Sequence, residues 1–186
     1  MSLSTILSYR SFPLPIGEPS ISSDMREAEA SIKKLAGVYE GDPVFITRQD
    51  LPTWYYLLLL KHLSRISPEV VCKMESGIYV VLHTIYQNDV TIARPESVHL
   101  FAELFTPPPS PSQPDAVAVD LRSLPTITPA NIGERIRTMQ KTIPSSIPKV
   151  VFSGTGDPLT ALIAYTLWRS SAHQCVYTVG ETVLAL

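Results

Sequence analysis

Short apolar runs alternate with amphipathic stretches along both halves of the chain. In the second half, "AVAVDL", "KVVFS", "QCVYTV" and "ETVLAL" have the length and the β-branched content of strands. Between the first two runs, Ile132, Ile136 and Met139 recur at helical spacing, and Thr128 before them suits an N-cap. "PLTALIAYTLWR" reads as a second, apolar helix. The second half is therefore predicted to run strand, helix, strand, turn, helix, strand, turn, strand.

The first half repeats this order of elements. "VFIT", "VVCKM" and "IYVVLHT" read as strands, and "LPTWYYLLLLKHL" reads as an apolar helix. When the halves are aligned at an offset of 106 residues, Pro52 falls on Pro158 and Ile46 falls on Phe152 without a gap. Because a missed internal repeat would change the whole architecture, we take this alignment as a hypothesis of two tandem α/β repeats. Chance agreement between two unrelated strand and helix units is the alternative.

Proline marks the boundary between the two halves. The segment "TPPPSPSQP" contains five prolines, which remove backbone donors and favour an extended, semi-rigid linker. We therefore predict a first repeat at residues 1–105, a linker at 106–114 and a second repeat at 115–186. In the first repeat, "PESVHLFAELF" at 95–105 has helical apolar spacing and is predicted to be an extra helix without a counterpart in the second half.

Composition excludes several classes of protein. Hydrophobic residues make up 45% of the chain and charged residues 17%, which provides enough apolar material for a core. A net charge of -2 gives no surface-wide attraction for duplex DNA. The longest uninterrupted apolar run, at 54–60, is far shorter than the roughly 20 residues that span a bilayer. With no signal-peptide pattern at the start and no paired cysteine spacing, the sequence predicts a cytoplasmic protein without membrane contact.

The turn between "KVVFS" and the second apolar helix is the most distinctive local feature. It reads "SGTGDP", from Ser153 to Pro158. Gly154 and Gly156 permit backbone conformations that other residues rarely adopt, and the following helix directs unpaired N–H groups toward the turn. Such a corner can hold a phosphate or a ribose. It is equally compatible with a turn required only by close packing, and Asp157 at the helix start competes with an anion.

These residues resemble a known family. A strand, then Ser-Gly-x-Gly-x-Pro, then an apolar helix is similar to the small CRISPR-associated ring nucleases of type III systems, whose signature runs Ser-Gly-Arg-Gly-Pro-Ile-Trp-Leu. In the first half, "TRQDLPTWYYLLLLKH" places Arg48, Trp54 and His62 like the family's arginine, tryptophan and helix histidine. His83 in "GIYVVLHT" resembles the histidine that closes the family's last strand. The chain therefore looks like a tandem fusion of two such units.

The resemblance implies a fold, a ligand and a reaction. The expected fold is two tandem ferredoxin-like α/β repeats that form a pseudo-dimer within one chain. The expected ligand is cyclic oligoadenylate, and in the family cyclic tetra-adenylate, the messenger of type III antiviral defence. The expected activity is that of a hydrolase that cleaves this ring with the help of manganese and so switches signalling off. The family's dimers also imply a homodimer of the fused pair.

The chain departs from the family's pattern at several positions. Nothing matches the family's Asp-Pro-Arg-Leu-Gly motif, so the acid and the arginine of that motif are missing. Thr155 stands where the signature has arginine, and Asp157 is inserted before the proline. These departures bear on cleavage of the ring more than on its binding.

Residues for each chemical role can nevertheless be named. RNA transesterification needs a base, an acid and a cation that stabilises the phosphorane. His62 and His83 titrate near neutral pH and are the candidate acid and base, and Arg48 is the candidate cation. Glu75 is the candidate metal ligand. The candidate ligand-binding residues are Ser153, Gly154, Thr155, Gly156, Arg169 and, as a stacking surface for adenine, Trp54.

Each candidate has a structural alternative. His62 near a helix end can cap carbonyl groups, His83 can be an exposed strand end, and Trp54 can lie in the core. Three functions therefore stay open: a ring nuclease, a sensor or sponge that binds the messenger without cleaving it, and a protein-interaction scaffold without a nucleotide ligand. The first predicts that both histidines and an arginine converge with the Ser153 turn. The second predicts the turn without an acid-base pair, and the third predicts no basic or aromatic concavity.

Overall fold

The computed structural model describes residues 5–8, 10–11, 25–47, 51–73, 79–85, 90–93, 97–99 and 115–186, with side chains described within 27–47, 51–73, 80–85 and 115–186. The chain divides into two compact units. The first comprises Met1–Leu51 and Leu58–His99, and the second comprises Pro52–Leu57 and Leu100–Leu186. Helices and strands alternate in both units, which confirms the predicted mixed α/β class.

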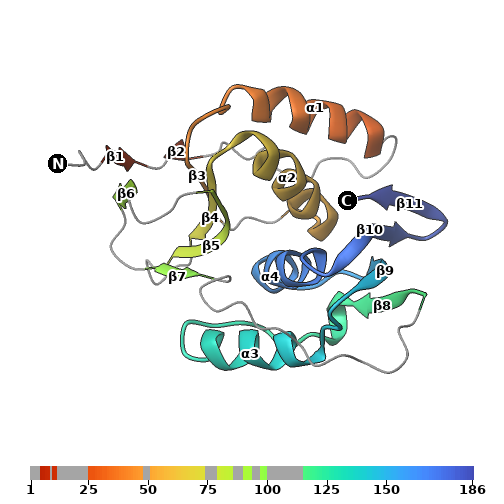
Figure 1. Cartoon of the computed structure of the whole chain (residues 1–186). Helices are drawn as coiled ribbons and strands as arrows, with labels where there is room; N and C mark the ends of the chain where they lie inside the picture. The colour runs from red at the N-terminus through yellow and green to blue at the C-terminus, as the bar shows by residue number, and fades with distance from the viewer. Residues whose placement is uncertain are drawn as a thin grey trace. The chain divides into compact units, whose positions relative to one another are not determined.

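The second unit contains a four-stranded sheet in the order β11-β10-β9-β8 (Figure 1). Its elements in chain order are β8 (Val117–Asp120), the 3-10 turn η1 (Leu121–Ser123), α3 (Ile132–Thr142), β9 (Ile147–Ser153), α4 (Pro158–Arg169), β10 (Ala172–Val179) and β11 (Thr182–Ala185). β8, β9 and β10 are parallel, and β11 is antiparallel to β10. Each parallel connection therefore contains one helix, as parallel strands require.

The core of the second unit lies between one face of this sheet and its two helices. Val119, Phe152 and Tyr177 are in register on adjacent strands, and all three are buried. From α3, the core receives Ile132, Ile136 and Met139, which confirms the face predicted from their spacing. α4 is buried from Leu159 to Trp168, as its continuous apolar sequence predicts.

The start of α3 differs from the prediction. The helix begins at Ile132, and Asn131 rather than Thr128 occupies the N-cap. The Thr128 N–H instead donates to Oδ1 of Asn131 at 2.8 Å, while the Asn131 amide donates to the Thr126 carbonyl at 3.2 Å. The Asn131 side chain thus closes a local turn that delays the helix, a known competitor of helix formation.

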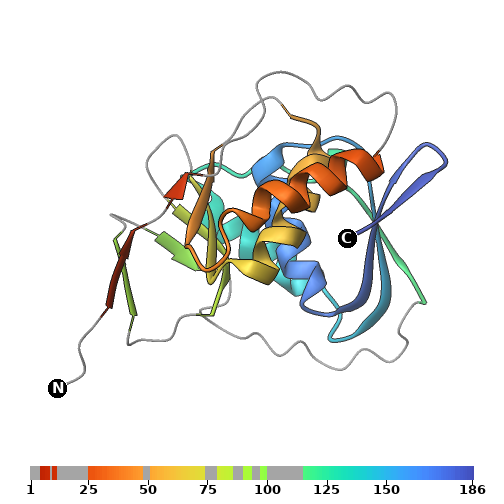
Figure 2. The same cartoon turned by 90° about the horizontal axis from the view of Figure 1, so that it is seen from above.

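The first unit contains a five-stranded sheet in the order β2-β3-β4-β5-β7. Its elements are β2 (Arg10–Ser11), α1 (Met25–Gly37), β3 (Val44–Thr47), α2 (Thr53–Ile66, whose first turn clusters with the second unit), β4 (Glu69–Lys73), β5 (Tyr79–Thr84) and β7 (Ser97–His99). A separate parallel pair, β1 (Thr5–Ser8) and β6 (Val90–Ala93), runs side by side in Figure 2. The order and directions of β2, β3, β4 and β5 are the same as those of β8, β9, β10 and β11.

Two expectations about the fold are not met. Ferredoxin-like repeats are not confirmed, because that fold follows the order βαββαβ, whereas the second unit runs βαβαββ with three parallel strands in sequence. The extra helix expected at 95–105 is not observed where that segment is described. Ser97–His99 forms β7, with Val98 in register with Val80 of β5, so a β-branched residue joins a sheet edge. In the described part of the chain, no helix has both the length and the apolarity to cross a bilayer.

Candidate functional site at the carboxyl edge of the second sheet

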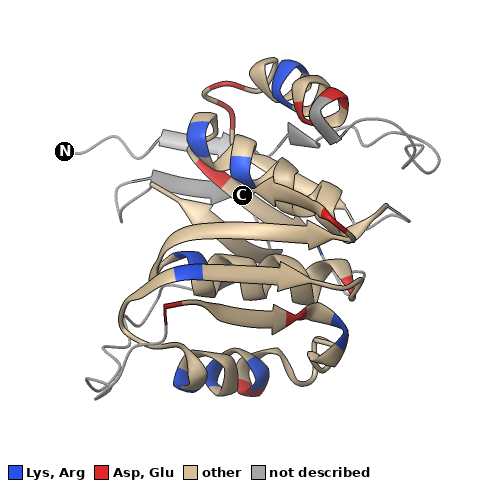
Figure 3. Cartoon of the chain, turned by 90° about the vertical axis from the view of Figure 1, so that its right-hand side faces the viewer, with Lys and Arg blue, Asp and Glu red and all other residues tan. Residues whose placement is uncertain are grey.

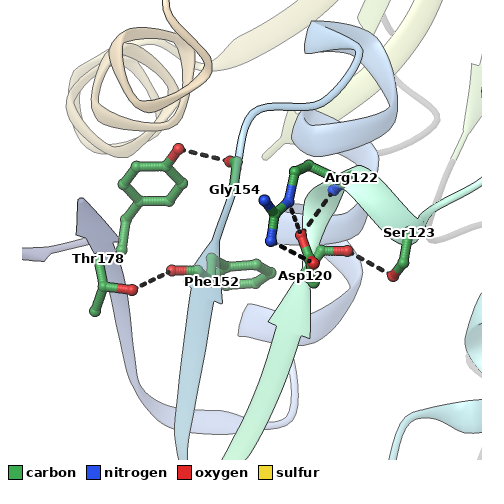
Figure 4. Close-up of polar contacts among 7 residues, drawn as sticks. Asp120, Arg122, Ser123, Phe152, Gly154 and Thr178 are labelled. Carbon is green, nitrogen blue, oxygen red and sulfur yellow. Dashed lines mark hydrogen bonds and ion pairs between the residues drawn. The ribbon is translucent and has the colours of Figure 1, made fainter. Parts of the chain in front are cut away.

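The turn from Ser153 to Asp157 joins the carboxyl end of β9 to α4. Gly154 has a φ of 78°, in the left-handed region that favours glycine. Its carbonyl oxygen accepts a hydrogen bond of 2.7 Å from the hydroxyl of Tyr177 on β10 (Figure 4). The turn is therefore held to the neighbouring strand at the residue where the chain changes direction.

Both glycines of the turn lie against the end of β8. A Cβ at Gly154 would lie 2.5 Å from Oδ1 of Asp120 and 2.9 Å from Nε of Arg122. A Cβ at Gly156 would lie 2.6 Å from the carbonyl oxygen of Leu121. Real Cβ atoms essentially never approach other heavy atoms this closely. Close packing against backbone atoms is therefore a sufficient reason for Gly156, whereas the neighbours of Gly154 are ends of exposed side chains and its positive φ is the reason for glycine there.

The backbone of Gly156 is already hydrogen-bonded within the second unit. The buried Thr53 hydroxyl accepts from the Gly156 N–H at 3.2 Å and donates to the Gly156 carbonyl oxygen at 3.1 Å. Thr53 belongs to Pro52–Leu57, the segment that clusters with the second unit. One hydroxyl thus satisfies both polar groups of this residue, and the Gly156 amide is not open to an anion.

The amino end of α4 is capped by its own sequence. Oδ2 of Asp157 accepts from the Thr160 N–H at 2.9 Å and from the Thr160 hydroxyl at 3.0 Å, and the Thr160 hydroxyl accepts from the Ile127 N–H at 3.1 Å. An acidic N-cap followed by proline is a favourable helix start. Since a carboxylate already occupies the positive end of the helix dipole, it competes there with any anionic ligand.

A row of polar side chains follows the carboxyl ends of the three parallel strands. Asp120 of β8 is in register with Ser153 of β9, which is in register with Thr178 of β10. Thr178 donates a long hydrogen bond of 3.4 Å to the Phe152 carbonyl oxygen. In open α/β sheets, ligands bind outside the carboxyl ends of the strands, so this row is where a ligand is expected.

Arg122 folds back over the end of β8 (Figure 4). Its Nε donates to Oδ1 of Asp120 and its Nη2 donates to Oδ2, each at 3.0 Å, while the Arg122 backbone N–H also donates to Oδ1 at 3.0 Å. Ser123 closes the same turn with a 2.7 Å hydrogen bond to the Asp120 carbonyl oxygen. The hydrogen bonds from Arg122 lower the pKa of Asp120, and the same pair raises the pKa of Arg122. The Arg122 side chain remains 67% exposed, so its remaining donors face solvent.

His62 takes part in a different arrangement, in the first unit. Its Nε2 lies 3.2 Å from Oε1 of Glu29 on α1, and Nζ of Lys61 lies 3.0 Å from the same oxygen. Burial, opposed by the Glu29 hydrogen bond, lowers the pKa of His62. The pKa of Glu29 is lowered too, because Lys61 and His62 outweigh the effect of its burial. The imidazole of His62 thus joins two helices of the first unit.

The other expected catalytic residues lie elsewhere. His83 is half-buried on β5, in register with Val70 of β4. Nε2 of His62 is hydrogen-bonded to Glu29 rather than to His83. Arg48 and Glu75 lie outside the described residues. Within the described ranges, no three His, Cys, Asp or Glu side chains are grouped so that they could hold a metal ion.

Two expected ligand-binding residues have structural contacts. Trp54 is buried and packs edge-on against Tyr55, with ring centroids 5.9 Å apart. Arg169, at the end of α4, places its guanidinium 5.4 Å from the Tyr165 ring centroid, a cation–π contact. Of the remaining candidates, Ser153 is half-buried and Thr155 is exposed. Thr155 is therefore the more accessible of the two turn hydroxyls.

The structure adds residues that sequence analysis did not single out. Asp120 is the last residue of β8, within the predicted strand "AVAVDL", and Arg122 follows that stretch directly, so a charged pair at the end of a strand was the available signal. Thr53 and Tyr177 gave no signal, because their partners lie 103 and 23 residues away in the sequence. No family model, curated protein or solved structure matches the chain.

Proposed function

We propose that this chain binds cyclic oligoadenylate at the carboxyl edge of its second sheet, as a sensor or sponge for the messenger of type III CRISPR defence. The observation that carries the proposal is the row Asp120, Ser153 and Thr178 beside the exposed guanidinium of Arg122. Cyclic oligoadenylate as the ligand comes from the resemblance of "SGTGDP" to the ring-nuclease signature.

The proposed contacts are made by side chains rather than by backbone amides. The Gly156 amide and the first turn of α4 are satisfied by Thr53 and Asp157, so a phosphate is expected at the guanidinium of Arg122. Arginine donors suit phosphate oxygens in geometry and charge. The hydroxyls of Ser153 and Thr155 are suited to ribose or phosphate oxygens.

Binding without cleavage is the form of the proposal that the described contacts favour. Nε2 of His62 is engaged by Glu29, and its lowered pKa reduces the fraction available as a general acid at neutral pH. The expected Asp-Pro-Arg-Leu-Gly motif is also missing from the sequence. Ring cleavage is therefore the alternative result that the binding experiment must also detect.

The experiment measures binding of radiolabelled cyclic tri-, tetra- and hexa-adenylate by gel shift, with chromatography of the same samples to detect cleavage. We expect one ring to bind, and Arg122→Gln to weaken its binding at least about tenfold, since charge-assisted hydrogen bonds are among the stronger ones. Arg137→Gln, at an exposed arginine of α3, is the matched control and should bind as the wild type does. Failure of the wild type to bind any ring would contradict the proposal. Cleavage that His83→Ala abolishes would instead establish the nuclease.

A further inference from the structure

The carboxyl edge of the second sheet carries carboxylates as well as a guanidinium. Asp120 and Arg122 form an ion pair there, with Nη2 of Arg122 3.0 Å from Oδ2 of Asp120. Figure 3 shows an acidic and a basic position next to each other where β8 ends. Asp157 adds a second carboxylate at the start of α4. Two carboxylates and one guanidinium give these three residues a formal net charge of -1.

The ion pair lies directly against the turn that contains Ser153 and Thr155. A Cβ built on Gly154 would lie 2.5 Å from Oδ1 of Asp120 and 2.9 Å from Nε of Arg122. The carboxylate and the guanidinium are therefore about equally close to the backbone of the turn. A phosphate that contacts both the turn and Arg122 consequently lies near Asp120 too. It is attracted by one group and repelled by the other.

Asp120 also decides which donors of Arg122 a ligand can use. Nε donates to Oδ1 and Nη2 donates to Oδ2, each at 3.0 Å, so Asp120 occupies the side-on edge of the guanidinium. These bonds use two of the five N–H donors that a guanidinium has. The other donors lie on the end-on edge, and the Arg122 side chain is 67% exposed. A phosphate is therefore expected across the guanidinium from the carboxylate, with the two anions about 6 Å apart.

We propose that Asp120 is a specificity-determining residue, which makes this site select phosphodiesters over terminal phosphate monoesters. The inference rests on the proposed function, because it concerns the ligand of the same edge. A phosphodiester carries one negative charge, whereas a monoester carries nearly two at neutral pH. An arginine alone favours the doubly charged group, and the carboxylate of Asp120 removes that advantage. The site thereby distinguishes an intact ring, which contains only diesters, from linear nucleotides that end in a phosphate.

Coulomb's law gives the size of the expected effect. In water, two unit charges about 6 Å apart change an equilibrium constant about threefold. Asp120→Asn removes the carboxylate charge but keeps an oxygen that can accept from the Arg122 backbone N–H, the bond that caps η1. This variant should therefore bind a phosphodiester about threefold more tightly than the wild type does. It should bind a monoester about tenfold more tightly, because the repulsion acts on each charge of the ligand.

Two matched probes test this difference on the full chain. Adenosine 2′,3′-cyclic phosphate and adenosine 3′-phosphate each contain one phosphate and differ by one ester bond. Titration at pH 7.5, followed by the NMR signals of the Ser153 and Thr155 amides, gives both dissociation constants. The wild type should bind the cyclic phosphate at least as tightly as the 3′-phosphate, and Asp120→Asn should bind the 3′-phosphate about threefold more tightly than the cyclic phosphate. Asp115→Asn is the matched control, because Asp115 is exposed and roughly 15 Å from Asp120 along the chain, beyond the screening length of about 8 Å.

Salt dependence supplies an independent measurement. At about 1 M salt the screening length falls to about 3 Å, so the difference between the wild type and Asp120→Asn should disappear. An unchanged ratio of the two dissociation constants in Asp120→Asn would overturn the inference while leaving ring binding intact. Weaker binding of both probes would also overturn it, because Asp120 would then orient Arg122 and not select the ligand. A wild type that binds no ring in the gel shift contradicts the proposed function and this inference with it.

Discussion

Replacing Gly156 by alanine tests whether the turn before α4 is fixed by close packing. The added Cβ would lie 2.6 Å from the carbonyl oxygen of Leu121 and 3.1 Å from its carbonyl carbon. Both atoms belong to the backbone, so no side-chain rotation relieves the contact. Since ordinary contacts begin at 3.4 Å, either β8 or the turn must shift by several tenths of an ångström.

The expected cost follows from the nature of this clash. Inserting a methyl group into a well-packed region usually costs about 1–3 kcal/mol, and a backbone neighbour puts Gly156→Ala near about 2–3 kcal/mol. Gly180→Ala has a φ of 57° and nothing within 4 Å, so only left-handed strain of about 1 kcal/mol is expected. Gly133→Ala, in open space on helix α3, should be neutral or stabilise by about 0.5 kcal/mol.

Urea unfolding followed by tryptophan fluorescence measures these differences in the free energy of unfolding for the second unit of the chain. The two tryptophans, Trp54 and Trp168, are both buried and both belong to the second unit. We expect midpoints in the order Gly133→Ala, Gly180→Ala, Gly156→Ala, from highest to lowest. If Gly156→Ala costs no more than Gly180→Ala, the packing explanation is refuted and the glycine needs another reason, such as a ligand close to the main chain.

Three further changes give distinct results. Thr53→Val should lower the free energy of unfolding by about 2–3 kcal/mol, because it leaves both polar groups of Gly156 unpaired. Thr53→Ser keeps the hydroxyl and loses only a buried methyl group, so it should cost about 1 kcal/mol. The urea midpoints of the two variants test the difference. Asp157→Ala removes the N-cap of α4 and should lower the free energy of unfolding by about 1 kcal/mol. Asp157→Asn keeps a capping oxygen and should cost less in the same urea experiment. Because the folded chain lowers the pKa of His62 below 6.5, its contribution to stability is complete above that pH and is lost as the pH falls through the folded pKa. Thermal melts between pH 5 and 8 should therefore show a smaller loss on acidification for His62→Gln, and an equal loss would contradict the burial of this group.

The elements of the second unit could be predicted because burial imposes a period on the sequence. The spacing of Ile132, Ile136 and Met139 predicted the buried face of α3, and the continuous apolar run of α4 predicted its complete burial. The predicted start at Thr128 was wrong because a side chain three residues later decides it. Asn131 bonds the Thr128 N–H, an interaction that the pattern of apolar residues does not contain.

The candidate site was less predictable, because its geometry depends on residues far apart in the sequence. "SGTGDP" predicted a turn between a strand and a helix, but the atoms that surround it come from β8, η1, β10 and Thr53. Which residues meet there depends on strand register, and no local pattern fixes the register between β8 and β9. His62 illustrates the same limit, since its partner Glu29 lies 33 residues earlier on another helix.

The glycines also distinguish the sequences of the two halves at this corner. At the offset of 106 residues that aligns the halves, Arg48 and Asp50 stand where the second half has Gly154 and Gly156. A residue with a Cβ cannot make the approach that Gly156 makes to Leu121, so the close corner is a property that only the second half's sequence permits. The two units share an order of strands, yet the ligand contacts proposed for the edge beside Arg122 require the glycine-containing turn. A single site per chain, in the second unit, is therefore the arrangement that these sequences support, and gel-shift titration to saturation should give one bound ring per chain.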